Sequence, residues 1–138
     1  MRTYLVVIDE TEEAKVALRF ASRRAVKTGG SVQILALVPR QEFVAWGGAQ
    51  ATMEEEARDR AETLLASAAG TIFDESGLRP AIMVRIGKGV DVVRKIIEGN
   101  KDIDALVLAA ADHGPPGPLV AHFTGHNAGT LPCPVMVI

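Results

Sequence analysis

Cysteine, aromatic side chains, long apolar runs and net charge are all scarce in this chain of 138 residues. The one cysteine, Cys133, cannot form an internal disulfide, so we expect a protein of the reducing cytoplasm. Prolines 132 and 134 flank it, and we interpret this thiol as structural rather than redox-active. The first apolar run, Tyr4 to Ile8, is too short for a signal peptide or a membrane span. A net charge of −2 argues against a general electrostatic attraction to nucleic acid or anionic lipid.

Sequence signatures of catalysis are also missing. The chain has no Gly-x-x-x-x-Gly-Lys-Ser/Thr loop, no Gly-x-Ser-x-Gly elbow, no His-Glu-x-x-His pair and no Cys-x-x-Cys. The segment Gly87-Lys88-Gly89 lacks a following serine or threonine, and we interpret it as a strand-to-helix turn. We therefore name no catalytic residue and expect a binding protein rather than an enzyme.

Aliphatic residues are abundant, and they follow two alternating patterns. Short apolar runs predict strands at about residues 4–8, 32–38, 81–86, 105–109 and 135–138. Helical periodicity predicts helices at about 11–28, 52–73, a short stretch after 89, and 119–130. Helix-length connections between strands require parallel pairing and right-handed crossovers. The sequence thus predicts an α/β fold in one domain, 1–138, a three-layer sandwich around a five-stranded parallel sheet of order 3-2-1-4-5.

An irregular loop is expected from Pro39 to Gln50, and it carries Phe43 and the single tryptophan, Trp46. An aromatic pair on such a loop could close over a ligand. We favour the alternative, in which both rings pack over a sheet edge or a partner.

The segment after the fourth predicted strand combines features that favour and disfavour phosphate binding. A strand, a glycine-rich loop and a helix follow one another there, which is where open α/β folds hold phosphates on helix-start N–H groups. Three of the five residues in Gly114-Pro115-Pro116-Gly117-Pro118 are proline, which has no N–H to donate. Asp112 would also repel a phosphate. The loop therefore predicts a weakened phosphate site.

Four segments together resemble the universal stress protein family, the UspA-like domain, over essentially the whole chain. Asp9 and Thr11 resemble its Asp-x-Ser after the first strand, and the segment from Val84 to Ile97 resembles its strand–Gly–helix unit. The segment from Asp102 to Ala109 resembles its fourth strand, and Cys133-Pro-Val-Met-Val-Ile138 its closing strand. The resemblance implies a Rossmann-like fold, similar to the adenine nucleotide α-hydrolases.

Some members of that family bind ATP or AMP through Gly-x2-Gly-x9-Gly-Ser/Thr, and others lack the motif. Here Gly114 and Gly117 match its first two glycines, whereas counting back from Pro134 places its Gly-Ser on Ala121 and His122. A Cβ at Ala121 would crowd a phosphate. We therefore expect a degenerate nucleotide site without tight ATP binding. The alternative is a member that binds ATP or AMP with magnesium and hydrolyses the nucleotide slowly.

The resemblance places any nucleotide at the carboxyl ends of the first and fourth strands, where strand order reverses. It implies that Asp9 faces ribose or a metal and that the Leu37 backbone contacts adenine. The candidate residues are Ile8, Asp9, Thr11, Leu37, Ala111, Gly114, Gly117, Ala121, His122, Phe123 and Thr124.

All three histidines, His113, His122 and His126, fall near this loop. His122 and His126 would share one helix face if the helix covered both, and two imidazoles so placed can hold a metal or an anion. A metal or anion site is therefore a second alternative, although we favour a polar helix face with no ligand.

The last strand also predicts a partner. Residues 135–138 would form an exposed apolar edge of the sheet, and the resemblance implies a homodimer through this strand. We expect a cytoplasmic, dimeric stress-response protein that binds a small molecule and regulates, without nucleic acid or membrane partners.

Overall fold

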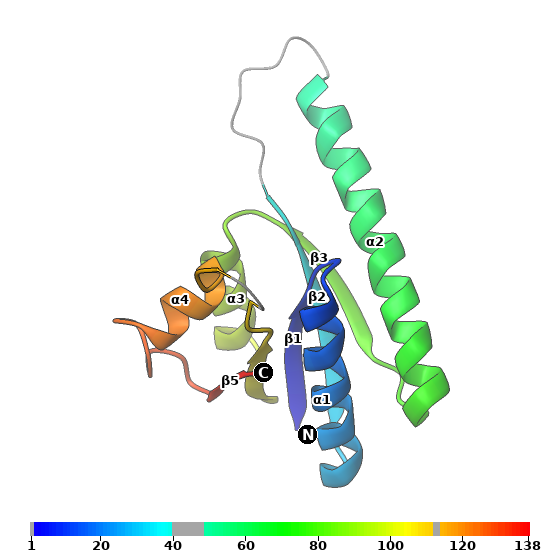
Figure 1. The fold of residues 1–138 in the computed structure, drawn as a ribbon, viewed down its shortest axis with the longest axis vertical. Coiled ribbons are helices and arrows are strands. Elements are labelled where there is room, and N and C mark those ends of the chain that lie inside the picture. The colour runs from blue at the N-terminus through cyan, green and yellow to red at the C-terminus, as the bar shows by residue number, and fades with distance from the viewer. Residues whose placement is uncertain (1, 40–48, 112–113) are drawn as a thin grey trace.

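The computed structural model describes residues 2–39, 49–111 and 114–138, and in these ranges it forms one sheet covered by helices (Figure 1). The sheet has the order β3-β2-β1-β4-β5, and all four neighbouring pairs are parallel. The predicted fold class is thereby confirmed. The elements in chain order are β1 (Thr3–Ile8), α1 (Glu12–Thr28), β2 (Ser31–Val38), α2 (Ala49–Ser76), β3 (Ala81–Ile86), α3 (Gly89–Glu98), β4 (Ile103–Leu108), α4 (Pro118–Thr124) and β5 (Val135–Val137).

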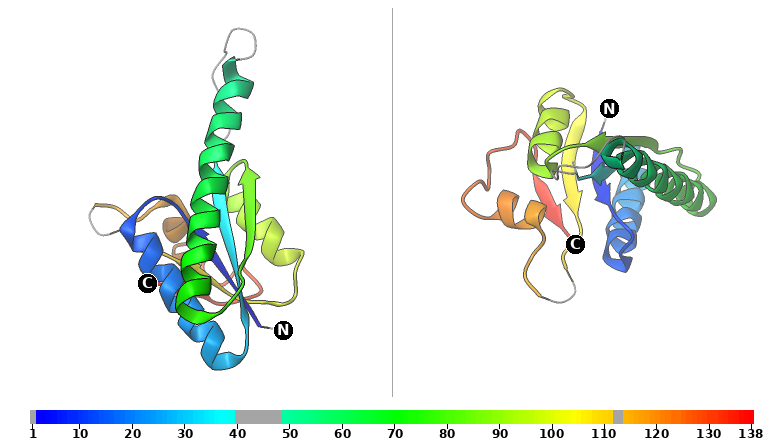
Figure 2. Two further views of the ribbon diagram at one scale, coloured as in Figure 1. Left: turned by 90° about the vertical axis from the view of Figure 1, so that its right-hand side faces the viewer. Right: turned by 90° about the horizontal axis from the view of Figure 1, so that it is seen from above.

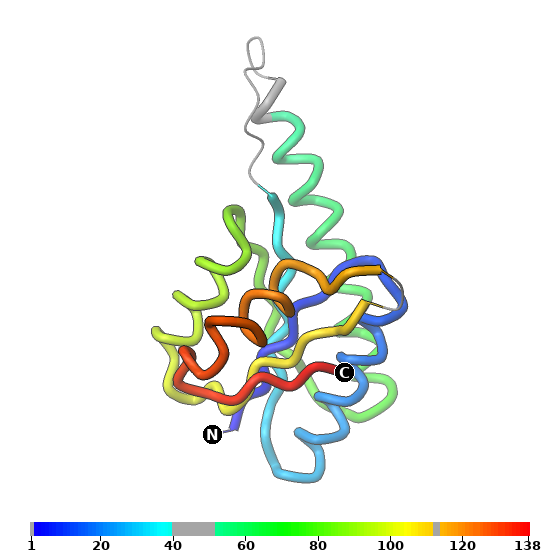
Figure 3. The backbone as a smooth tube through the Cα atoms, turned by 60° about the vertical axis from the view of Figure 1, so that its left-hand side comes forward, coloured from blue at the N-terminus to red at the C-terminus, as the bar shows by residue number. Residues whose placement is uncertain are grey.

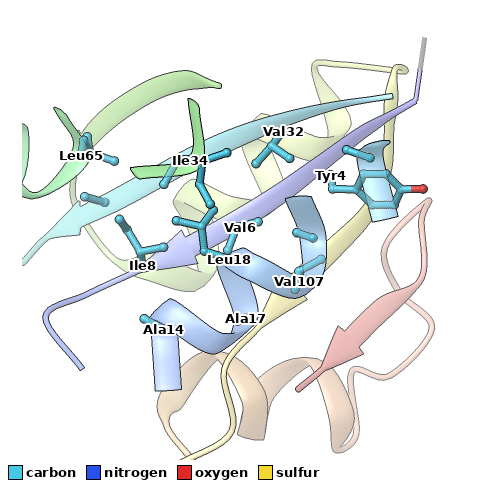
Figure 4. Close-up of a cluster of buried hydrophobic side chains, with 14 of the residues drawn as sticks. Tyr4, Val6, Ile8, Ala14, Ala17, Leu18, Val32, Ile34, Leu65 and Val107 are labelled. Atoms are coloured by element: carbon cyan, nitrogen blue, oxygen red, sulfur yellow. The ribbon is translucent and has the colours of Figure 1, made fainter. Parts of the chain in front are cut away.

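Two hydrophobic layers hold this sandwich together, because successive strand residues point to opposite faces. Tyr4, Val6 and Ile8 of β1 face α1 and α2 and belong to the first buried cluster (Figure 4). Leu5 and its neighbours on β2 and β4 face α3 and α4 and form the second cluster. Figure 2 shows the two helix pairs on opposite sides of the sheet. The inner strands are buried on both faces, which explains their continuous apolar sequences.

Helix α1 begins and ends through residues that its sequence supplies. The Thr11 hydroxyl caps the helix by accepting a hydrogen bond from the Ala14 N–H at 3.2 Å. Gly29 ends it in the left-handed conformation, with φ at 68°. The strand that follows starts at Ser31, so only Gly30 separates the helix cap from the sheet.

Helix α4 is much shorter than predicted. The expected helix over 119–130 begins at Pro118 and ends at Thr124, since Gly125 leaves the helical conformation with ψ at −131°. Gly129, with φ at 77°, forms a turn in the segment that leads to β5. Helix α2 is longer than predicted, and Figure 1 shows its first turns projecting past the sheet. Phe43 and Trp46 lie outside the described residues. No helix in the described ranges combines the length and the apolar character needed to cross a membrane.

Candidate functional site

The main cleft lies at the carboxyl end of the sheet, where strand order reverses between β1 and β4. Its volume is about 690 Å³, which suits a small organic ligand. Apolar residues and glycines supply most of the lining: Val7, Ile8, Asp9, Ala14, Leu37, Pro39, Gly87, Lys88, Gly89, Val90, Leu108, Ala109, Gly117, Pro118, Leu119 and Val120. Among these residues only Asp9 and Lys88 carry charge.

Asp9 is held in place by the residue two positions after it. One carboxylate oxygen, Oδ1, accepts hydrogen bonds from the Thr11 N–H at 2.9 Å and from the Thr11 hydroxyl at 2.5 Å. The Asp-x-Thr sequence thus forms an Asx turn that fixes the side chain before α1 starts. Because both bonds use Oδ1, Oδ2 is available to accept a bond from a ligand hydroxyl.

Two leucines and a glycine form the apolar wall of the cleft. A Cβ on Gly89, the first residue of α3, would lie 3.0 Å from Cδ1 of Leu37 and 3.5 Å from Cδ2 of Leu119. The side chains from β2 and from α4 therefore meet over Gly89, and the glycine leaves room for them. Lys88, next to it, caps α3 without a side-chain hydrogen bond and is exposed to solvent.

The start of α4 offers few donors to the cleft. Gly117 is the N-cap, and Pro118 occupies the first helical position, so one N–H is missing there. The Ala121 N–H already donates to the Gly117 carbonyl at 2.9 Å. Only the N–H groups of Gly117, Leu119 and Val120 remain at this end, and the last two residues present aliphatic side chains to the cleft.

The candidate residues from the sequence separate into those that line this cleft and those that lie elsewhere. Ile8, Asp9, Leu37 and Gly117 line it. Ala121 and His122 belong to the second turn of α4 rather than to its start. Phe123 and Thr124 line a smaller hollow of about 330 Å³ beside β5. Thr11 holds Asp9, and Ala111 and Gly114 are exposed outside the described cleft lining.

Sequence reasoning missed the wall formed by Lys88, Gly89, Leu119 and Val120. A usable signal was present, because Gly87-Lys88-Gly89 follows a strand and turns of that kind lie at the carboxyl edge of a parallel sheet. The contact of Leu119 with this turn had no local signal, since the two segments are 30 positions apart in sequence.

The histidines are not arranged as the spacing suggested. Helix α4 ends before His126, so His122 and His126 do not share a helix face. The His122 ring packs edge-on against Phe123 at 4.8 Å, and its Nδ1 lies 3.5 Å from the Asn127 side-chain amide. His113 lies outside the described residues. Within the described ranges, no three His, Cys, Asp or Glu side chains are grouped closely enough to hold a metal ion.

Cys133 is half-buried beside β4, and burial raises the pKa of its thiol. A hydrogen bond with the Leu106 backbone lowers that pKa, and the charge of Asp104 raises it further. We expect alkylation of Cys133 by iodoacetamide at pH 8 to be slower than alkylation of an unfolded control, because the thiolate is the nucleophile. Mass spectrometry of timed samples with and without urea measures the two rates. Equal rates in both would mean that the thiol is as accessible and as acidic in the fold as in the open chain.

Comparison with known proteins places the whole chain in one group. A family model described as the universal stress protein family matches residues 1–138. The universal stress protein UspA from Lactobacillus plantarum has a similar structure, with a TM-score of 0.85, 17% identity, and coverage of 99% of this chain and 97% of that one. No curated protein sequence matches the chain.

Two further similar structures contain a nucleotide. One is the universal stress protein from Archaeoglobus fulgidus in complex with dAMP, with a TM-score of 0.71, 19% identity, and coverage of 100% and 98%. The other is a universal stress family protein from Arabidopsis thaliana with AMP bound, with a TM-score of 0.64, 18% identity, and coverage of 100% and 91%. At these identities the likeness establishes the shared fold.

Proposed function

This chain belongs to the universal stress protein family, and we propose that within the family it is a cytoplasmic, homodimeric binding and regulatory protein rather than an enzyme. Its ligand is a nucleoside or a nucleoside monophosphate, held in the cleft between β1 and β4. The nucleotide site is degenerate for ATP, which binds weakly.

This proposal rests on the small number of hydrogen-bond donors and charged groups at the start of α4. A triphosphate needs several converging N–H donors and cationic side chains. Pro118 removes one donor, and Leu119 and Val120 present aliphatic surface where polar groups would be needed. Lys88, which lies next to Gly89 in the same wall, is the one cation among the lining residues. Lys88 and the few N–H groups at the start of α4 can therefore neutralise one phosphate group far better than three.

The same cleft also has groups that suit a nucleoside. Asp9 is oriented by Thr11 and has Oδ2 available for a ribose hydroxyl. Leu37 and the glycines of the β3–α3 turn provide an apolar slot for a planar base. The dAMP and AMP bound to similar structures are monophosphates, which agrees with a ligand of this class.

Homodimerisation through β5 completes the proposal. On one side β5 pairs with β4, and its other side is an edge of the described sheet, seen in red in Figure 3. Val137 on this strand is exposed. An apolar edge strand of this kind pairs readily with its own copy about a two-fold axis.

Isothermal titration with adenosine, AMP and magnesium–ATP tests the ligand class. We expect AMP to bind at least about tenfold more tightly than ATP, a difference of roughly 1.4 kcal/mol. Asp9→Asn should weaken AMP binding, because the carboxylate is the stronger acceptor. Asp104→Asn, which removes an exposed carboxylate outside the described cleft lining, should leave it unchanged.

Two results would contradict the proposal. ATP affinity equal to that of AMP would show that the proline-containing helix start still provides enough donors for a triphosphate. Failure of all three compounds to bind would show that the ligand is not an adenine nucleoside or nucleotide.

A further inference from the structure

The outer face of α1 carries an unusual mixture of apolar and basic side chains. Val16, Phe20 and Val26 are exposed to 56%, 37% and 53%. Arg19, Arg23 and Lys27 follow one another at four-residue spacing, so they form a row on the same side of the helix. We call these six residues the basic–apolar stripe. Single exposed apolar residues are ordinary, but three on one helix face beside a row of cations indicate a contact surface.

Towards the C-terminal end of α1, the cations of the stripe are exposed and mostly have no ion-pair partner among the described residues. Arg19 forms an ion pair with Glu75 at 3.1 Å, while Arg23 and Lys27 have no ion-pair partner among the described residues. A groove of about 630 Å³ runs between them and the end of α2, and Val26 and Ile72 supply its apolar part. An occupant of this groove should therefore be acidic and partly apolar.

The chain itself has a segment of that character at the start of α2. Glu55, Asp59 and Glu62 are exposed and lie on one helix face, with spacings of four and three residues. Glu62 pairs with Arg58 at 3.5 Å, and no ion pair of Glu55 or Asp59 occurs within the described residues. Met53, nearby on the same helix, is exposed and apolar. We call residues 53–62 the acidic segment.

Within one copy the stripe and the acidic segment are too far apart to meet. Helices α1 and α2 run in the same direction, but they are shifted along their axes. The ion pair between Arg19, near the middle of α1, and Glu75, at the end of α2, shows this shift. The acidic segment therefore projects beyond the start of α1, as the left view of Figure 2 shows. The basic half of the stripe reaches past the end of α2.

We propose that a second copy of this chain docks on this face in antiparallel orientation, with the acidic segment of each copy against the basic–apolar stripe of the other. A two-fold axis near the start of α1 brings both pairs of charges together at once. The contact places Met53 of each copy near the exposed Val26 of its mate. It is independent of the edge of β5, which lies at the opposite end of the strand order from the strands that α2 covers.

Sedimentation equilibrium of the full chain with Val137→Asp, which blocks pairing at the β5 edge, isolates this contact. We expect dimers at low salt that dissociate at about 1 M salt, where the screening length falls to roughly 3 Å. Adding Arg23→Glu and Lys27→Glu should raise the dissociation constant at least about tenfold, since four ion pairs across the two-fold axis become repulsive. Lys95→Glu with Lys101→Glu changes the net charge equally on other exposed positions and should leave the constant unchanged.

A charge exchange gives the decisive measurement. Glu55→Lys with Asp59→Lys should weaken self-association as strongly, yet a mixture of this variant with Arg23→Glu, Lys27→Glu should form heterodimers as tight as the parent. Both contacts become attractive again in that mixture. Circular dichroism verifies that each variant remains folded. A parent that stays monomeric at low salt, or a mixture that fails to associate, would overturn the proposal, and so would equal weakening by the Lys95 and Lys101 control.

Discussion

Replacing Leu35 with alanine is expected to lower the free energy of unfolding by about 3–4 kcal/mol. Leu35 is 0% exposed in the middle of β2, and its strand neighbours are Val7 on β1 and Met83 on β3. It belongs to the buried cluster under α3. A parallel strand with neighbours on both sides has little freedom to collapse into the space left by the missing methyl groups, so the cavity remains.

Ile82→Ala is the matched control for this prediction. Ile82 lies on the edge strand β3 and is 49% exposed, so its truncation should cost less than about 1 kcal/mol. Urea unfolding followed by far-ultraviolet circular dichroism measures both variants, with the slope against denaturant expected to stay constant. Equal losses at the two positions would mean that β2 is not the centre of the core.

Gly30→Ala is expected to destabilise the fold by about 2 kcal/mol through a collision rather than a cavity. A Cβ at this position would lie 2.5 Å from the Arg2 carbonyl oxygen, which also accepts the Ser31 N–H at 2.7 Å. The added methyl group must push β1 away from β2 where their pairing begins. No flexible side chain can move aside, because the atom in the way belongs to the backbone.

Gly70→Ala provides the opposite control within α2. Gly70 is exposed in the helix interior, and apart from its chain neighbours and the adjacent backbone of α2 no atom lies within 4 Å of the position of an added Cβ. Alanine should therefore raise stability by about 0.5–1 kcal/mol. Thermal unfolding of both variants gives the comparison. A stabilised Gly30→Ala would mean that the chain before Thr3 is not held against Gly30.

The sheet was predictable from sequence because each of its strands has a local signal. Runs such as Leu5 to Ile8 and Ile34 to Val38 are apolar on both faces, and helix-length connections leave parallel pairing as the consistent arrangement. The Asp9–Thr11 turn also depends only on local sequence, since its hydrogen-bond donor and acceptor are two residues apart. The strands and this turn could therefore be predicted without information about contacts between residues distant in sequence.

The phosphate side of the cleft was harder to predict, because it depends on where α4 begins. Counting residues back from Pro134 placed the family's Gly-Ser on Ala121 and His122, and the sequence separately predicted a helix over 119–130. Gly125 ends the helix early, and the helix begins at Pro118, so Ala121 and His122 fall in its second turn. The meeting of Leu37 and Leu119 over Gly89 is a tertiary contact with no periodic signal in either segment.

The hydroxyl group of Thr11 joins two parts of the molecule that otherwise lie on separate elements. It donates its proton to the Asp9 carboxylate in the cleft and accepts the N–H of Ala14 in the first turn of α1. Because the Thr11 hydroxyl points its proton at Asp9, its lone pairs are oriented towards the Ala14 N–H. Asp9 thereby sets the orientation of the hydroxyl that caps α1. A change of charge or a ligand at Asp9 is therefore expected to alter the N-terminal cap of α1 as well as the cleft.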